Sequence, residues 1–318
     1  MKFPAILPMR RTRPLAAALT AALLVACGGG TSQIDAFVAK QLVAFGDEHS
    51  VLTSDGRRYV VNRLDSSDVF DCTLNPIWVQ SLAEIYGFVF AECNPTNVAE
   101  PKAIMRAAAG ARAADLVTQI DAQLAAGGVA DDTLVTVLVG ANDIVDLYAV
   151  YDADPHTDRS ELLAEARRRG EAVARQVNRL VDAGARVIVA TVPDIGLTPY
   201  ALAEKAAHDD SDRAELLTAL STELNTGLRI AVLNDGRFVG LALADEMVQA
   251  MAKAPSAFGV ANITDGACAV ALPDCAEDTM VSGADATTWL WADALHIGFN
   301  AQNRLSILAI NRARNNPF

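Results

Sequence analysis

The sequence predicts an α/β fold, a three-layer α/β/α sandwich in which helices cover both faces of a parallel sheet. Short runs that are apolar throughout alternate with longer segments of helical periodicity, and wholly apolar strands are typical of parallel sheets buried on both faces. Several of these runs end in glycine or proline followed by Asp or Asn, where this architecture collects working groups. The 318 residues, 52% of them apolar, suffice for one large domain.

Strands and helices are expected in alternation along the chain. Four apolar runs are expected to form strands, at residues 41–45, 133–139, 186–191 and 238–243. Periodicity and end signals predict five helices, at residues 75–86, 113–126, 160–182, 211–233 and 300–314. Pro76 lies in the first turn of the first helix and Gly87 follows its end, while Gly127 and Gly184 end the second and third. Residues 268–288 are small and polar, which predicts a loop.

The first residues predict an export signal. Four positive side chains precede an apolar run at residues 15–25, which is too short to span a bilayer. The run closes at Cys27, and three glycines follow, a pattern that resembles a bacterial lipobox. Residues 1–26 are then a lipoprotein signal peptide, residues 27–40 the lipidated cysteine and a tether, and residues 41–318 the folded domain. An ordinary secretory signal with an incidental Cys27 is the alternative, and Met9 is an alternative start.

Charge and location follow from this interpretation. The net charge is −13, and removal of a positive leader makes the remaining chain more acidic. An acidic surface argues against nucleic acid as a partner and against electrostatic docking on anionic lipid, so membrane attachment rests on the lipid anchor. We expect an exported protein of the bacterial cell envelope. Gly28, in place of an aspartate after the lipidated cysteine, favours the outer membrane, with the domain facing the periplasm or the exterior.

Apart from Cys27, the chain has four cysteines, at Cys72, Cys93, Cys268 and Cys275. An even count in an exported chain predicts disulfides. Three pairings exist, and we favour Cys72–Cys93 with Cys268–Cys275 because each closes a short local loop. A metal site is the competing interpretation, but no Cys-x-x-Cys occurs and few histidines lie near the motifs, so we expect no metal.

Four short blocks occur in a fixed order: Phe45-Gly46-Asp47-Glu48, Ala109-Gly110-Ala111-Arg112, Gly140-Ala141-Asn142-Asp143 and Asp293-Ala294-Leu295-His296. Their order and spacing resemble the GDSL, or SGNH, family of ester hydrolases over roughly residues 41–312. The resemblance implies the SGNH hydrolase fold with a flavodoxin-like parallel sheet. It also implies hydrolysis of carboxylic esters, such as acyl or acetyl groups on a small molecule, lipid or glycan, without a metal or organic cofactor. No Gly-x-Gly-x-x-Gly after a strand and no Walker A motif indicates a nucleotide either.

The resemblance assigns roles that ester hydrolysis requires. His296 is the candidate base, and Asp293, three residues earlier, can fix its tautomer; the alternative is a surface loop pair. Asn142 and Gly110 match the donors to the oxyanion, one through a side-chain amide and one through a backbone N–H. The alternative for Asn142 is a turn residue or a helix cap, and the signal at Gly110 is weaker because its surroundings are rich in alanine.

The nucleophile position departs from the family, because Glu48 stands where the resemblance expects serine. One hypothesis is that Glu48 acts as a base on water or as a carboxylate nucleophile. A second is that Ser50 attacks instead, although in a helical turn it lies about 200° around from Glu48. His49 is another acid–base group or a turn residue. The third hypothesis is that Glu48 fills the oxyanion donors and pairs with a protonated His296, which blocks substrate.

We therefore expect a carboxylic-ester hydrolase with an atypical nucleophile position. The alternative is a catalytically inactive envelope lipoprotein that binds an acyl or glycan ligand in the same site. The position of the Glu48 carboxylate discriminates between the two: a carboxylate seated against Asn142 and Gly110 favours the binding protein.

Overall fold

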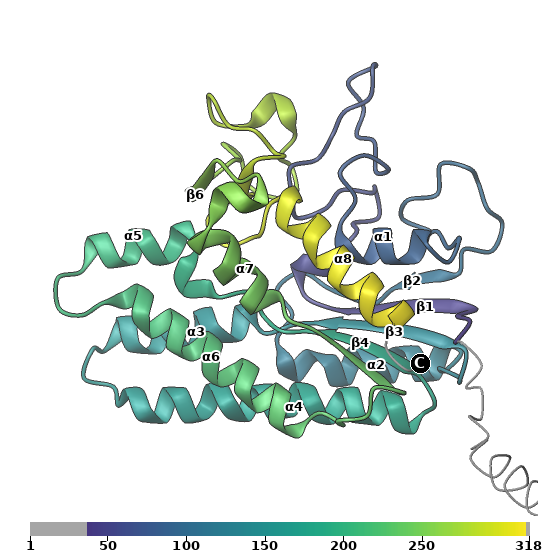
Figure 1. Ribbon diagram of the computed structural model, residues 1–318, viewed down its shortest axis with the longest axis horizontal. Coiled ribbons are helices and arrows are strands. Elements are labelled where there is room, and N and C mark those ends of the chain that lie inside the picture. The colour runs from purple at the N-terminus through teal and green to yellow at the C-terminus, as the bar shows by residue number, and fades with distance from the viewer. Residues whose placement is uncertain (1–36, 316–318) are drawn as a thin grey trace, which may run out of the picture. The chain divides into compact units, whose positions relative to one another are not determined.

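A five-stranded parallel sheet forms the centre of the computed structural model, which describes residues 37–315 (Figure 1). The strands are β1 (Gln41–Gly46), β2 (Ala103–Met105), β3 (Thr133–Leu138), β4 (Arg186–Ala190) and β5 (Val239–Ala242). Their order is β2-β1-β3-β4-β5, with every neighbouring pair parallel. This is the flavodoxin-like order, so the predicted α/β class and parallel sheet are confirmed.

The strands are mostly apolar because both of their faces are buried. In β1, Leu42 and Ala44 pack on one side of the sheet, while Val43 and Phe45 pack on the other, and none of the four is accessible to solvent. Alternate residues of a strand point to opposite faces, so a strand with helices on both sides favours apolar residues at consecutive positions. The register of β1 with β3 brings Gly46 beside Leu138, so the two strands end at the same edge of the sheet.

Helices cover both faces, as Figure 1 shows. One face is covered by α1 (Trp78–Glu84), α7 (Ala244–Lys253) and α8 (Phe299–Asn315). The other is covered by α2 (Leu116–Ala126) and α4 (Arg159–Asp182), with α6 (Arg213–Ala231) packed along α4. Two further helices, α3 (Ala141–Ala153) and α5 (Pro199–Ala207), join α4 and α6 in a separate apolar cluster. The three layers follow from this arrangement.

Helices α4 and α6 pack unusually closely because each has a glycine at the contact. A methyl group on Gly170 of α4 would lie 1.8 Å from the carbonyl oxygen of Leu224 in α6. A methyl group on Gly227 of α6 would lie 2.1 Å from the carbonyl oxygen of Arg167 in α4. The spacing of this helix pair therefore depends on the missing side chain at both positions.

Several element bounds differ from the sequence prediction. Helix α1 begins at Trp78 rather than at residue 75, because Asn75 has a left-handed φ of 51° and lies outside the helix. The predicted helix at 113–126 opens with a 3-10 turn, Ala113–Asp115, before α2 begins. Helices α3, α5 and α7, strand β2 and a small two-stranded sheet of β6 (Asn262–Gly266) and β7 (Trp289–Trp291) were not predicted. The predicted loop at 268–288 has only one 3-10 turn, Glu277–Thr279.

Both favoured disulfides are present, Cys72–Cys93 and Cys268–Cys275, with Cα atoms 5.7 Å and 5.8 Å apart. The first joins the segment before α1 to the loop before β2, and the second closes part of the 268–288 loop. The predicted signal peptide, Cys27 and most of the tether lie outside the described residues. Among residues 37–315, no helix has the length and apolar character needed to cross a membrane.

Candidate functional site

The site begins where β1 ends. Gly46 has a φ of +129°, and a methyl group there would lie 1.9 Å from the carbonyl oxygen of Leu138, so only glycine fits. The side-chain amide of Gln119 holds both backbone groups of Gly46 at 2.9 Å. The chain then enters a 3-10 turn, Glu48–Ser50, which Asp47 caps by accepting from the backbone N–H of His49. This turn places Glu48 at the edge of the sheet.

The Glu48 carboxylate lies on both predicted oxyanion donors. One oxygen accepts a short hydrogen bond from the backbone N–H of Gly110, and the other accepts from Nδ2 of Asn142 at 2.9 Å. Gly110 has a left-handed φ of +75°, which glycine adopts at little cost and which turns its N–H toward Glu48. The structure thus brings Glu48, Gly110 and Asn142 together, which is the first part of the third hypothesis. Its second part, an ion pair between Glu48 and His296, is not seen: among residues 37–315 the ion pair of His296 is with Asp293.

A buried carboxylate fixes the loop that carries these donors. Asp143 accepts from the backbone N–H of Ala113 at 2.8 Å and from Arg169 of α4 at 3.2 Å. Asn142 also donates to the carbonyl oxygen of Ala111 at 3.1 Å. Burial raises the pKa of Asp143, although the hydrogen bonds from Ala113 and Arg169 act to lower it. Sequence reasoning did not assign Asp143 or Arg169; the available signal was an aspartate directly after Asn142.

The Asp293–His296 pair lies beyond β7. Nδ1 of His296 is 2.9 Å from each carboxylate oxygen of Asp293, and one of these oxygens also accepts from the backbone N–H of His296 at 2.7 Å. The loop approaches β6 so closely that a methyl group on Gly266 would lie 2.7 Å from the Asp293 backbone. Asp293 therefore fixes the orientation of the His296 ring and leaves Nε2 as the nitrogen free for chemistry.

The surrounding charges favour a protonated His296. Burial acts to lower the pKa of this imidazole, but the hydrogen bond and charge of Asp293, with the charges of Glu48 and Asp47, raise it above its usual value. Burial acts to raise the pKa of Asp293, and the interactions with His296 lower it instead. The protonated form of His296 is thus stabilised chiefly by Asp293, with smaller contributions from the charges of Glu48 and Asp47.

Ser50 is not placed as a substitute nucleophile. Its side chain is fully buried, and its hydroxyl accepts a hydrogen bond from Nε1 of Trp78 at 3.2 Å. The 3-10 turn directs Ser50 into the core, under α1, while Glu48 remains half-buried at the surface. A ligand arriving from solvent therefore meets Glu48 and does not meet the Ser50 hydroxyl.

Two rings lie against His296: that of His49, which the sequence offered as an acid–base group or a turn residue, and that of Tyr59, which the sequence did not assign to the site. The His49 ring is buried, has Nδ1 3.0 Å from Asp47, and lies 5.5 Å from the His296 ring between centroids. The Tyr59 ring is half-buried, and its centroid lies 5.6 Å from the centroid of the His296 ring. Burial, followed by the charges of Glu48 and Asp274, raises the pKa of the Tyr59 phenol. The contacts depend on how a long loop folds back, which no local sequence pattern reveals.

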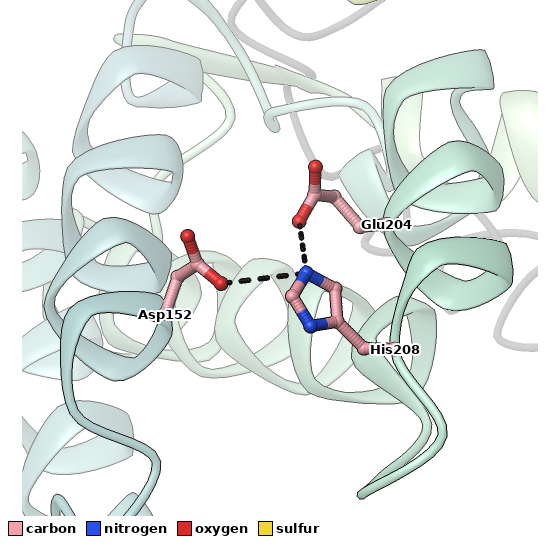
Figure 2. Close-up of side chains that lie close together, drawn as sticks. All are labelled: Asp152, Glu204 and His208. Carbon is pink, nitrogen blue, oxygen red and sulfur yellow. Dashed lines mark ion pairs between the residues drawn. The ribbon is translucent and has the colours of Figure 1, made fainter.

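A separate group of side chains has the chemistry of a metal site. Within residues 37–315, Asp152, Glu204 and His208 are the one group of three such residues whose ligand atoms lie within 4.8 Å of one another. Figure 2 shows both carboxylates facing the same ring nitrogen of His208, at 3.6 Å and 3.5 Å. The buried Arg213 guanidinium contacts Asp152 and the other ring nitrogen at 3.4 Å. Because the Arg213 cation already compensates Asp152, the arrangement fits an ion-pair network between helices.

Comparisons with known proteins place these features in context. A family model described as GDSL-like Lipase/Acylhydrolase matches residues 42–296. A solved structure of a lipolytic G-D-S-L family protein from Veillonella parvula is 12% identical, with 85% of this chain and 96% of that chain covered and a TM-score of 0.42. A catalytic mutant of Axe2, an acetylxylan esterase from Geobacillus stearothermophilus, is 10% identical, with 87% and 95% covered and a TM-score of 0.44. A search of curated proteins found no match.

Proposed function

Because this chain belongs to the family of GDSL-like lipases and acylhydrolases, we propose that its site binds a carboxylic ester without hydrolysing it by the serine route. The ligand is an acyl or acetyl group carried by a small molecule, a lipid or a glycan. The observation that carries this proposal is that the Glu48 carboxylate accepts hydrogen bonds from both Gly110 and Asn142. The wild-type protein is then a binding member of a family of ester hydrolases.

Two requirements of the serine route are unmet while Glu48 occupies this position. The route needs a hydroxyl nucleophile beside the histidine, and removal of a catalytic serine costs about 10⁶-fold in kcat in a serine hydrolase. It also needs free donors for the oxyanion, each of which contributes about 10²–10³-fold. Glu48 replaces the hydroxyl and occupies both donors. A bound ester carbonyl must therefore lie beside the Glu48 carboxylate.

A second function, ester hydrolysis with Glu48 as the base for an attacking water, is favoured by the Asp293–His296 pair. This pair has the orientation that general acid–base catalysis requires, with Nδ1 held at 2.9 Å. In this mechanism the carboxylate leaves Gly110 and Asn142 when the ester carbonyl enters, and it then takes a proton from water. The notable cost is the loss of two hydrogen bonds to a charged acceptor, each worth roughly 1.5–3 kcal/mol.

A panel of short and medium acyl esters tests both functions with the purified protein. We expect no hydrolysis by the wild type and clear hydrolysis by Glu48→Ser, since serine restores the hydroxyl and vacates the donors. Addition of His296→Ala to Glu48→Ser should abolish that activity. Wild-type activity that disappears in His296→Ala and in Glu48→Gln would overturn the binding proposal in favour of the water mechanism. An inactive Glu48→Ser variant with native circular dichroism would contradict the assignment of the site itself.

We also propose that Cys27 carries a lipid anchor in the bacterial cell envelope, with sorting to the outer membrane. The support is the apolar run that ends at Cys27 and the glycines after it. Incorporation of a radiolabelled fatty acid into the expressed full-length chain tests this proposal. The label should be absent from Cys27→Ala, and equal labelling of both chains would exclude this cysteine as the anchor.

A further inference from the structure

We propose that Glu48 is a nucleophile toward saturated carbon, and that this site opens epoxides to diols through a covalent ester on Glu48. This activity goes beyond ester binding and does not rest on it. The geometry that carries it is a carboxylate held by two oxyanion donors in the same turn as His49, whose ring lies 5.5 Å from that of His296 in an oriented Asp–His pair. Each of these parts has a defined role in a carboxylate-based mechanism, including the donors that Glu48 itself occupies.

The choice of electrophile follows from what the donors hold. Attack on an ester carbonyl creates an oxyanion on the substrate, which needs Gly110 and Asn142 at the moment when Glu48 occupies them. Attack on a saturated carbon creates no oxyanion at that carbon, so Glu48 keeps both hydrogen bonds while it reacts. A carboxylate has about four acceptor positions, and the two donors use two of them. Carboxylates serve as nucleophiles of this kind in other enzymes.

In the first step, an oxygen of Glu48 forms a bond to an epoxide carbon and the carbon–oxygen bond of the ring breaks. The released oxygen takes a proton from the His296 imidazolium. The products are a hydroxyalkyl ester on Glu48 and a neutral imidazole. The negative charge of Glu48, which favours protonation of His296 beforehand, is consumed in the same step, so His296 becomes a base when a base is next required.

In the second step, neutral His296 takes a proton from water, and the resulting hydroxide attacks the ester carbon of Glu48. The carbonyl oxygen of that ester already lies on the Gly110 or Asn142 donor, so the oxyanion forms where it is stabilised. The intermediate expels the alkoxide, which takes the proton from His296 and leaves as the diol. The Glu48 carboxyl then returns its proton to His296. The net reaction consumes one epoxide and one water.

Isotope incorporation tests the covalent step directly. The purified protein is incubated with phenyl glycidyl ether over many turnovers in water enriched in the heavy oxygen isotope, then digested and analysed by mass spectrometry. We expect diol formation and heavy oxygen in the peptide that contains Glu48, because hydroxide attacks the Glu48 carbon. Heavy oxygen in the diol but not in Glu48 would overturn the nucleophile assignment in favour of direct attack by water. Absence of diol would overturn the activity.

Two variants separate the steps. His296→Gln should lower epoxide turnover by about 10²–10⁴-fold, the usual contribution of an acid–base group. With 1-bromohexane, whose bromide leaves without a proton, the same variant should accumulate a hexyl ester on Glu48. The isosteric Glu48→Gln control should show neither adduct nor turnover; an equal adduct in this control would place the alkylation elsewhere. Hydrolysis of acyl esters by Glu48→Ser, beside a wild type silent toward both electrophiles, would refute this inference while leaving the proposed binding function intact.

Discussion

The contact between α4 and α6 yields a quantitative prediction for Gly170→Ala. The added methyl group would lie 1.8 Å from the carbonyl oxygen of Leu224, whereas real contacts of this kind begin near 3.0 Å. The neighbouring atom belongs to helix backbone, so one helix must move by more than an ångström. Overpacking of this kind costs about 1–3 kcal/mol of the free energy of unfolding. For a chain of this size, that lowers Tm by roughly 2–12 °C.

Thermal unfolding followed by circular dichroism measures the effect. Gly127→Ala is the matched control, because a methyl group there meets no atom within 4 Å and the residue follows the last turn of α2. We expect the control to unfold near the wild-type temperature. A Tm for Gly170→Ala within about 1 °C of the wild type would refute the argument, since the shift predicted from the overpacking cost is larger.

Two more predictions concern the site and the disulfides. The pKa of His296 is raised above its ordinary 6.5, so its charge contributes stability that is complete below pH 6.5 and is lost as the pH rises through the folded-state pKa. Asp293→Asn should lower the pKa of His296 in an NMR titration and flatten this loss, and an unchanged titration would contradict the assigned cause. Replacement of Cys72 and Cys93 by alanine should cost about 3 kcal/mol in urea unfolding, because the disulfide closes a separation of 21 residues. The same change at Cys268 and Cys275, which are separated by 7 residues, should cost less; a larger cost there would contradict the loop-length argument.

Much of the fold was predictable because runs of apolar residues indicate strands that are buried on both faces. Runs such as 41–45 and 133–139 are mostly apolar at consecutive positions, and only a sheet covered on both faces buries residues on both sides of a strand. Helices α3 and α7 were missed because each follows a strand end almost immediately, without the loop that usually separates two elements. The small β6–β7 sheet was missed because its strands are short and irregular, and it forms only when two distant segments meet.

The sequence predicted which residues lie near one another in the site, but it did not predict where the Glu48 carboxylate lies. Parallel strands end at one edge, so Glu48 after β1 and Asn142 after β3 were expected to lie close together. Whether the longer glutamate side chain reaches the donors depends on small differences in distance, which the sequence does not determine. Tyr59 and His49 contact His296 through the fold of the loop after β1, which contains no periodic pattern.

The hydrogen bonds of Glu48 also affect how the site responds to free acids. Acetate and fatty acids carry the same group that Gly110 and Asn142 already hold. A carboxylate attached to the chain competes at an effective concentration of at least about the millimolar range, which dissolved acids must exceed to displace it. We therefore expect the wild-type site to bind free carboxylic acids more weakly than a Glu48→Ser site, because a serine at this position exposes both donors.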